Sequence, residues 1–363
     1  MKRIPEEVST AGMADGGLFF QYIGDEKGIQ GHQNSCYLDA TLFGLFALSS
    51  CFDELFLKVG TEDNQSIENI IWKKIVNPLR SCGAARYESV MALRERLDNL
   101  GKMKGITKDE KDPEEFLNML FKHVLHPDPF IEIRRPYGIE EEFFVQLFFE
   151  SEANSDATPT ISDMLHRMFT EQNLSFTKAP QWLLIQVPRF GKQFKTYKRV
   201  IPNKKLNVSK LVHTNQDGFC CWCDSPAAWK CKECATSTTD GTVCSFCSDR
   251  RHKSMKFKGH NPVALQKRTD VELDLLSVIC IETSHYVCFS QADDKWLFFD
   301  SMANRIGDKY NIPRCTNCTH EINGWVYEHP EKLHSTEPKP ELVRRFTQDV
   351  YMCVYVVQDV GMY

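Results

Sequence analysis

A cysteine stands where a helix is expected to begin. In the stretch GHQNSCYLDATLFGLF, residues 31–46, Asn34 and Ser35 are good N-cap residues, and apolar residues follow at helical spacing. The positive end of a helix lowers the pKa of a nearby thiol, and a thiolate is a strong nucleophile. Cys36 is therefore a candidate nucleophile. The alternative is a thiol that packs as a small apolar residue.

A thiol nucleophile needs a base to take its proton and a third group to orient that base. Among the eleven histidines, His285 lies in ICIETSHYVCFS, where a Ser-His pair interrupts an apolar, strand-like run. Fifteen residues later, Asp300 follows the strand-like run KWLFF. Two neighbouring antiparallel strands would place these side chains next to each other, as a Cys-His-Asp triad requires. The alternative for a single histidine in such a run is a satisfied core or edge residue.

A second constellation is built from three C-x-x-C pairs and two histidines within residues 213–262. Its members are Cys220, Cys223, Cys231, Cys234, Cys244, Cys247, His252 and His260. Eight such ligands complete two tetrahedral zinc sites, and closed four-ligand sites are structural rather than catalytic. About 50 residues with so few large apolar side chains could hardly fold without metal. Free thiols in a loop are the alternative.

The order of these ligands resembles the B-box zinc domain, in which two sites interleave. The resemblance implies one ion on Cys220, Cys223, Cys244 and Cys247, and a second ion on Cys231, Cys234, His252 and His260. Cys221, inside the first pair, could compete with its neighbours. A further pair, Cys315 and Cys318 with His320 nearby, lacks a fourth ligand.

Composition limits the class of protein. The chain has 363 residues, 42% hydrophobic and 26% charged, which is ordinary for a soluble globular protein. Its formal net charge is only -5, which gives no support to a general nucleic-acid or membrane binder. No apolar run approaches the roughly 20 residues of a membrane span, and the N-terminus has no secretory apolar region. Fifteen cysteines, an odd number with many in C-x-x-C pairs, indicate zinc in a reducing compartment, so we expect a cytoplasmic protein.

The elements that must position these residues change in kind along the chain. Helical periodicity is expected in residues 36–48, 67–79, 87–97, 113–124 and 161–169. Strands are expected in residues 143–149, 182–187, 195–201, 206–208, 275–282, 285–290, 295–299 and 351–357. The sequence thus predicts an α+β protein in five parts: a lead-in (1–27, with GGLFFQYIG extended), a helical lobe (28–130), a first β part (131–212), the zinc insertion (213–262) and a second β part (263–363).

Five sequence blocks, in order, resemble the ubiquitin-specific protease family. They are GIQGHQNSCYLDATLFGLF, KDPEEFLNML, WLLIQVPRF, SHYVCF and KWLFFDSM, and they span residues 28–301. The resemblance implies a papain-like cysteine protease fold with a helical thumb, a β-rich palm and, since residues 130–180 are short and lack cysteine pairs, shortened fingers. It implies that Cys36 is the nucleophile, that His285 acts as general base and then acid, and that Asp300 orients the imidazole.

The resemblance also implies a substrate. The bond after the C-terminal glycine of ubiquitin would be hydrolysed through an acyl-enzyme thioester. The B-box between the third and fourth blocks narrows the match and implies a preference for extended lysine-linked signalling chains and linear, head-to-tail chains. Asp112 and Glu115 would face the arginines of the ubiquitin tail. The alternative for this pair is a helix start that favours acids.

One position departs from the family pattern. Most members carry Asn five residues before the nucleophile as an oxyanion donor, and this chain has Gly31. The backbone N–H of Cys36 would then act with a side chain that the sequence does not identify, the candidates being Gln30, His32 and Asn34.

Two rival functions are considered. The first is a catalytically inactive ubiquitin-binding scaffold that works through its B-box, which could also contact other proteins. The second is a B-box protein of the ubiquitin-ligase type, which needs a RING domain before the B-box and a coiled coil after it, and no heptad pattern is visible.

Overall fold

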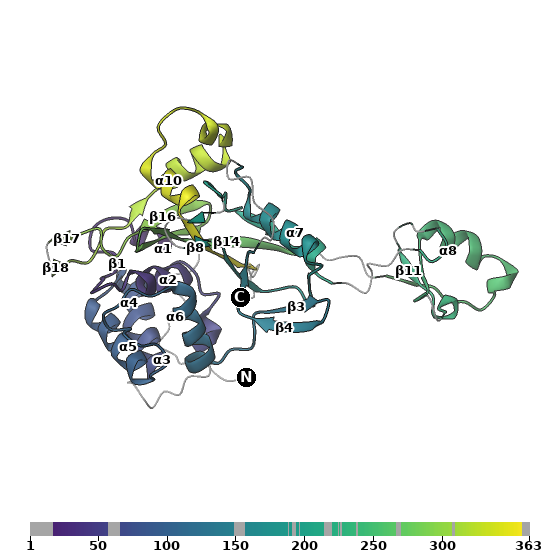
Figure 1. The fold of residues 1–363 in the computed structure, drawn as a ribbon, viewed down its shortest axis with the longest axis horizontal. Helices are drawn as coiled ribbons and strands as arrows, with labels where there is room; N and C mark the ends of the chain where they lie inside the picture. Colours follow the sequence, from purple (N-terminus) through teal and green to yellow (C-terminus); the bar gives the residue numbers. More distant parts are fainter. Residues whose placement is uncertain are drawn as a thin grey trace.

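The computed structural model describes residues 17–56, 66–148, 157–187, 189–190, 194–195, 197–213, 220–223, 225, 227–236, 239–265, 270–306 and 309–357. Figure 1 shows three bodies: a helical lobe, a β lobe in contact with it, and a small B-box lobe that stands apart. In the part of the chain covered by these ranges, no helix has the length and apolar character needed to cross a membrane.

The helical lobe is built from amphipathic and fully buried helices that follow one another closely in the sequence. Its elements are α1 (Gly17–Gln21), α2 (Cys36–Phe46), η1 (Asp53–Phe56), α3 (Ile67–Asn69), η2 (Ile70–Val76), α4 (Asn77–Cys82), α5 (Tyr87–Asn99), α6 (Pro113–Leu120) and η3 (Phe121–Leu125), with β1 (Gly28–Ile29) paired to β2 (Ala84–Ala85). The predicted helices in this lobe are confirmed, with α3, η2 and α4 forming one continuous helical segment. The predicted extended lead-in is wrong at 17–21, because the helical spacing of Phe19 and Tyr22 buries both rings; residues 1–16 lie outside the described ranges.

The β lobe is organised around one eight-stranded sheet. Its order is β19 (Thr316–Asn317), β16 (Lys295–Phe299), β15 (His285–Ala292), β14 (Glu272–Glu282), β20 (Val350–Val356), β7 (Trp182–Gln186) and β5 (Phe144–Gln146), with β10 (Lys205–Asn207) also paired to β14. All pairs are antiparallel except β5 with β7. Nearly every residue of β14 to β16 and β20 is buried or half-buried, so these strands form the centre of the core.

Shorter elements cover this sheet and its ends. They are β3 (Ile131–Arg135), β4 (Gly138–Glu142), α7 (Ile161–Glu171), β6 (Ser175–Phe176), β8 (Arg189–Phe190), β9 (Phe194–Lys195), η4 (Ser209–Leu211), β17 (Arg305–Ile306), β18 (Lys309–Tyr310), α9 (Thr319–Ile322), η7 (Asn323–Tyr327), η8 (Pro330–His334) and α10 (Glu341–Gln348).

Two predicted strands differ from the structure. Of the expected strand over 195–201, Lys195 belongs to β9 and residue 196 lies outside the described ranges, whereas the expectation is wrong at 197–200, where the Val200 N–H donates to the Thr347 carbonyl in α10. Ile201 forms only a single bridge, with Thr160 just before α7, and its N–H donates to the Pro159 carbonyl. The expected strand over 143–149 shortens to β5, and its last residue lies outside the described ranges.

Helix α2 lies directly on the central sheet, against β14 and β15. All eleven of its residues are buried, which matches a helix that is apolar on almost every side. Gly44 permits the close approach, because a Cβ there would come within 2.9 Å of Ser277 Oγ and 3.0 Å of Cys288 Sγ. Phe43 stacks on Phe299 with ring centroids 4.1 Å apart. The helix that carries Cys36 is therefore fixed against the strands that carry His285 and Asp300.

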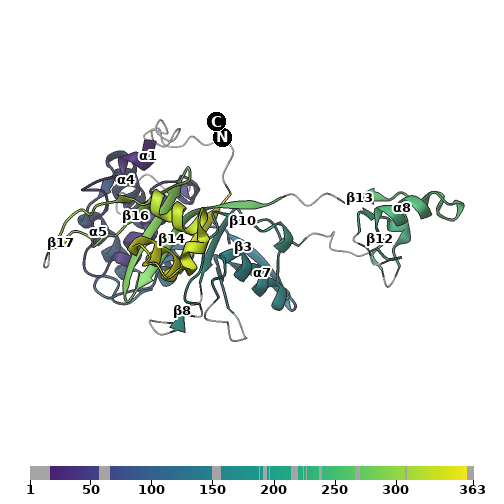
Figure 2. The same ribbon diagram turned by 90° about the horizontal axis from the view of Figure 1, so that it is seen from above.

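The B-box lobe contains β11 (Trp229–Lys230), η5 (Lys232–Cys234), β12 (Thr242–Val243), α8 (Ser245–His252), η6 (Met255–Phe257) and β13 (Val263–Ala264). Its strands form a three-stranded sheet of their own. Figures 1 and 2, seen from two perpendicular directions, both show it away from the other lobes. Its buried cluster consists of Cys220, Val243, Cys244 and Cys247, so most of its interior is made of cysteine.

Candidate active site and metal centres

Cys36 is the first residue of α2 and is 4% exposed. The predicted helix start is confirmed, but Ser35 does not cap it with its side chain. The Ser35 hydroxyl instead accepts the N–H of His32 at 2.8 Å and donates to Asp39 Oδ2 at 2.6 Å. Asn34 does not cap it either, because its amide donates to the Lys108 carbonyl at 3.0 Å. The thiol therefore lies at a helix N-terminus whose preceding turn is tied to other parts of the lobe.

His285 and Asp300 lie together at one end of the central sheet. His285 opens β15, and Asp300 directly follows β16. Because Cys288 pairs with Phe299, continuing the register would set Asp300 opposite Val287 and diagonal to His285 on the same face. The imidazole Nε2 donates to Asp300 Oδ1 at 2.7 Å, and the N–H of Met302 donates to the same oxygen at 2.9 Å.

The thiol of Cys36 reaches this pair across the seam between the two lobes. Its Sγ donates to the carbonyl oxygen of Ser284, the residue before His285, at 3.8 Å, which places the thiol beside the imidazole. Burial lowers the pKa of His285, but the hydrogen bonds and negative charges of Asp300 and Cys36 outweigh it and raise that pKa to about 9. The imidazole can therefore hold a proton beside the thiol at neutral pH.

Asp300 stays ionised in this setting. Burial by itself raises the pKa of the Asp300 carboxyl, yet the hydrogen bond and charge of His285, the Met302 N–H and the nearby Arg345 hold it below its ordinary value. A thiol, an imidazole and a carboxylate thus form a chain of neighbouring groups, in which the imidazole is hydrogen-bonded to the carboxylate. Such a chain can pass a proton from sulfur to nitrogen and stabilise the resulting ion pair.

Gly31 packs against Ser301, the residue after Asp300. A Cβ on Gly31 would come within 2.9 Å of the Ser301 carbonyl oxygen and 3.0 Å of its Oγ, and the Gly31 N–H donates to that carbonyl at 3.3 Å. Ser301 therefore occupies the space that an asparagine side chain would need. Glycine at position 31, where most family members have asparagine, therefore has a physical cause: Ser301, just after β16, fills the space.

Each of the three candidate oxyanion side chains contacts the helical lobe. Asn34 donates to Lys108 as described, the Gln30 amide oxygen accepts the Tyr87 N–H at 3.3 Å, and the His32 ring stacks on Tyr87 at 5.4 Å. Burial, and then the charge of Arg94, lower the pKa of His32. In the part of the chain that the structure describes, the N–H of Cys36 donates to no acceptor.

Asp112 and Glu115 lie at the start of α6 in different surroundings. Asp112 Oδ1 accepts the Glu114 N–H at 2.7 Å, which makes it the N-cap. Its carboxylate also accepts the hydroxyl of Tyr286, at 3.3 Å, and that of Tyr351. Asp112 therefore connects the helical lobe to β20 through Tyr351, and to β15 through Tyr286, the residue after His285. Glu115, by contrast, is exposed.

The eight predicted metal ligands form two groups of four. The first is Cys220, Cys223, Cys244 and Cys247, and the second is Cys231, Cys234, His252 and His260; within each group all ligand atoms lie within 4.8 Å of one another. These are the two groups that the resemblance implies, and either could hold a metal ion. Both donor sets, four thiols in the first group and two thiols with two imidazoles in the second, suit zinc. His252 directs Nε2 at Cys234, 3.4 Å away, while its Nδ1 donates to the Ser248 carbonyl at 3.2 Å, the outer contact that orients a metal-binding imidazole.

Cys315 and Cys318 do not form a further site. Both are buried in the main core, and within the described ranges they belong to no group of three or more close ligands.

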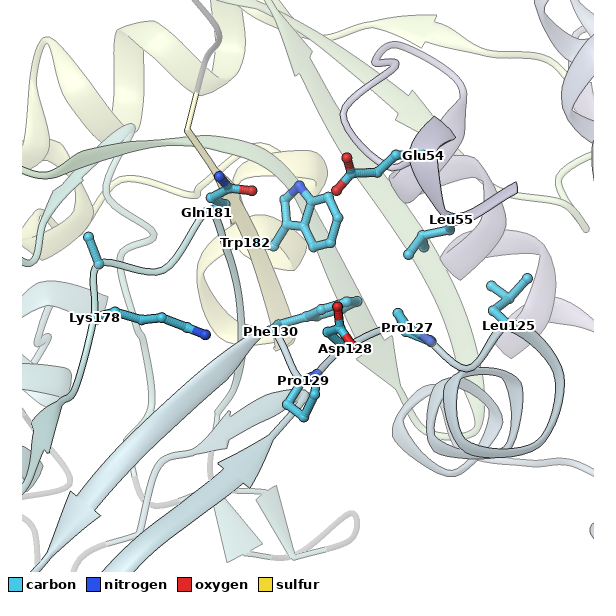
Figure 3. A pocket seen from close by; sticks show the side chains of 11 residues that line it. Glu54, Leu55, Leu125, Pro127, Asp128, Pro129, Phe130, Lys178, Gln181 and Trp182 are labelled. Carbon is cyan, nitrogen blue, oxygen red and sulfur yellow. The ribbon is translucent and has the colours of Figure 1, made fainter. Parts of the chain in front are cut away.

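A cavity of about 540 Å³ lies at the seam of the lobes (Figure 3). It is lined by Glu54, Leu55, Leu125, Pro127, Asp128, Pro129, Phe130, Lys178, Ala179, Gln181 and Trp182. Trp182 pairs with Val356 at one end of β20, and Tyr351, which contacts Asp112, lies toward the other end. The cavity is therefore separate from the catalytic centre.

Five further neighbours of the site carried no role in the sequence motifs: Asp39, Arg94, Ser301, Tyr286 and Tyr351. Only Asp39 carried a local signal, because it is a charged residue within the otherwise apolar run YLDATLF. Ser301 and Tyr286 directly follow Asp300 and His285 in the sequence, whereas Arg94 and Tyr351 become neighbours through contacts between distant segments.

Comparisons with known proteins identify the family of this chain. The family model described as "Ubiquitin carboxyl-terminal hydrolase" matches residues 27–312. The protein named "Ubiquitin carboxyl-terminal hydrolase CYLD" from Homo sapiens is 37% identical over 393 residues, covering 100% of this chain and 41% of the relative. The proteins of the same name from Bos taurus (38%, covering 94% of this chain and 39% of the relative) and Mus musculus (36%, covering 100% and 41%) are similar to a comparable extent. The chain thus spans about two fifths of the length of these relatives.

Proposed function

Because this chain belongs to the ubiquitin carboxyl-terminal hydrolase family, thiol proteases with a papain-like domain, we propose that it is a deubiquitinase that hydrolyses the bond after the C-terminal glycine of ubiquitin. The observation that carries the proposal is the hydrogen bond of 2.7 Å between His285 Nε2 and Asp300 Oδ1, beside the Cys36 thiol, whose Sγ lies 3.8 Å from the carbonyl oxygen of Ser284.

In the proposed mechanism, His285 accepts the thiol proton of Cys36, and the thiolate attacks the carbonyl carbon of the ubiquitin glycine. The carbonyl oxygen becomes an oxyanion, which the Cys36 N–H at the start of α2 faces as a donor. When the intermediate collapses, the imidazolium protonates the leaving amine and a thioester remains. His285 then takes a proton from water, whose oxygen attacks the thioester, releasing the ubiquitin carboxylate and restoring the thiol. Asp300 holds the imidazole in orientation throughout.

We further propose extended lysine-linked and linear polyubiquitin chains as substrates. In the described part of the region where many relatives carry their fingers, the sheet beside the palm consists of β3, β4 and β6, strands of five, five and two residues. Such short fingers give little surface for one ubiquitin, so contacts to both ubiquitins of a chain would select the linkage. The carboxylates of Asp112 and Glu115 are proposed to bind the arginines of the ubiquitin tail. Glu115 is the more exposed of the two.

The two cysteine-histidine clusters are proposed to bind two structural zinc ions. Zinc would supply the folding energy of the B-box and takes no part in the hydrolysis. The B-box would then present a rigid surface to other proteins. The reactive thiol and the thiolate clusters both require a reducing compartment, so we propose a cytoplasmic location.

Gly31 supports one second candidate, an inactive ubiquitin-binding scaffold, because the usual oxyanion side chain is missing there. Hydrolysis of ubiquitin carrying a C-terminal fluorogenic amide separates the two functions. The proposed enzyme releases the fluorophore, Cys36→Ala abolishes release, and Cys82→Ala, at an exposed cysteine, leaves it unchanged. Binding of ubiquitin without release would favour the scaffold. A panel of linkage-defined ubiquitin dimers then tests chain preference, and equal cleavage of compact and extended linkages would contradict it.

A further inference from the structure

The turn just before the nucleophile has a costly backbone conformation. The Ser35 N–H donates to the His32 carbonyl at 3.1 Å, and between them Gln33 and Asn34 have φ values of 40° and 60°. Two successive left-handed residues describe a type I′ turn, which normally uses Gly, Asn or Asp. Left-handed backbone costs roughly 1 kcal/mol or more for a residue such as glutamine. The turn therefore needs support from the surrounding structure.

Two fully buried charged side chains supply that support from two helices. Arg94 on α5 is 0% exposed; its Nη1 donates to the His32 carbonyl at 2.8 Å and its Nε to the Ile106 carbonyl at 2.5 Å. Asp39 on α2 is also 0% exposed, and its Oδ2 accepts the Ser35 hydroxyl, which in turn accepts the His32 N–H. The first residue of the turn is thus held at its carbonyl by Arg94 and at its N–H, through Ser35, by Asp39.

This arrangement is expensive, which indicates that it serves a purpose. Burying an arginine and a carboxylate that share no direct ion pair costs several kcal/mol, and an apolar pair of similar volume would often be as stable. The Ser35 hydroxyl can donate to Asp39 whether the carboxyl is ionised or protonated, so the support of the turn persists across neutral pH. Burial raises the pKa of Asp39 to about 7 against the opposing effects of Ser35, Ser301, Arg94 and His285.

The turn leads directly into Cys36, whose N–H has no acceptor within the described ranges. A donor aimed at a developing oxyanion helps only if its position is fixed before the reaction. We propose that Arg94 and Asp39 are positioning residues, which hold the His32–Ser35 turn so that the Cys36 N–H meets the oxyanion. The inference rests on the proposed function and identifies how this chain builds an oxyanion site without the usual asparagine at position 31.

The test compares two reactions of the same thiol. Hydrolysis of ubiquitin with a C-terminal fluorogenic amide develops an oxyanion, whereas alkylation of Cys36 by iodoacetamide does not. For Ser35→Ala and Asp39→Leu, kcat should fall about 30-fold or more with KM within twofold, and the Cys36 alkylation rate, read from the mass of its peptide, should stay within twofold. Asp39→Asn, which keeps an acceptor for Ser35, should retain kcat within about threefold. Arg94→Met should behave like Asp39→Leu.

The matched control lies on the same helix. Thr41 is buried and its hydroxyl donates to the Tyr37 carbonyl at 2.6 Å, so Thr41→Val removes a buried hydrogen bond without touching the turn. Its kcat should match the wild type. If Asp39→Leu or Arg94→Met fails to fold, the smaller Ser35→Ala change decides the test.

Unchanged kcat in folded Ser35→Ala would overturn the inference. A parallel loss of hydrolysis and alkylation would also overturn it, since it would mean a general effect on the thiol or the fold. Inactivity of the wild type itself would overturn the proposed function, and the inference with it, and is recognised before any variant is made.

Discussion

A large apolar core positions the three residues of the catalytic centre, Cys36, His285 and Asp300. All of α2 and most of the central strands are buried in this core. The B-box lobe, by contrast, has a small buried cluster of four hydrophobic residues, three of them cysteines, beside two clusters of ligand atoms. In the first region, packing brings together groups that are 249 and 15 residues apart in the sequence. In the second, short-range C-x-x-C turns bring the ligands together and a metal ion must supply the remaining cohesion.

Because of this difference, catalysis and zinc binding are expected to be separable in this chain. The triad contains no metal ligand, and the two lobes that form it make a continuous core of their own. The B-box stands apart in both views of the molecule. Loss of metal should therefore act on one region and loss of a triad member on the other.

The largest expected effect is metal removal. Structural zinc contributes on the order of 10 kcal/mol to folding of small zinc domains, so chelation should unfold residues 220–265 while hydrolysis of the monoubiquitin substrate stays within twofold. Limited proteolysis with mass mapping, beside activity, measures both. Metal analysis should give about two zinc ions per chain before chelation. Cys221→Ser is the control, because Cys221 belongs to neither cluster. Loss of activity together with loss of metal would contradict the independence of the triad from the B-box.

His285→Ala should lower kcat/KM by about 10⁴-fold, because the thiol loses its base and the leaving amine its acid. Zinc content and the fold should not change. His320→Ala, at an exposed histidine, is the matched control. Turnover within tenfold of the wild type would refute the role of His285.

Asp300→Asn should lower kcat/KM by about 100-fold and move its alkaline limb. The pKa of His285 is raised to about 9 from the ordinary value of 6.5 that it has in the unfolded chain. The imidazolium therefore contributes fully to the stability of the folded site below pH 6.5, and this contribution is lost as pH rises through 9. Without the carboxylate charge that pKa falls, so activity should decline at a lower pH. Asp294→Asn, at an exposed aspartate, should keep the wild-type profile. An unmoved limb would contradict the assignment of Asp300.

Gly31→Asn should lower kcat by about tenfold, although it restores the residue common in the family. The Cβ would meet the Ser301 carbonyl at 2.9 Å, so the side chain can enter only by displacing the strand end that carries Asp300. Gly31→Ala separates the effect of the Cβ from that of the amide, and Gly324→Ala, with open space around it, should be neutral. Higher activity in Gly31→Asn would show that the site can accommodate the asparagine.

The sequence could predict the parts of this molecule that rest on local patterns. Helix α2 followed from its periodicity, and the two ligand groups from C-x-x-C spacing and the B-box resemblance. Cys36, His285 and Asp300 were named from their residue types and flanking strands. Their approach depends on Gly44 and on the register of β15 and β16, which no local pattern contains.

The remaining features arise from contacts between distant segments. Arg94 reaches the His32 carbonyl from α5, and Tyr351 reaches Asp112 from a strand more than two hundred residues away. The expected strand over 195–201 was wrong at 197–200 for a similar reason, since the backbone of Val200 and Ile201 finds its partners in α10 and just before α7. Burial and hydrogen-bond partners of this kind are properties of the folded chain and leave no periodic signal.

The most direct measurement is the reaction of the chain with ubiquitin that carries an electrophile at its C-terminus, followed by intact mass and peptide mapping. The account predicts one ubiquitin per chain, attached to Cys36, with the same adduct after chelation and none in Cys36→Ala. A wild-type chain that forms no adduct, or an adduct at another cysteine, would contradict it.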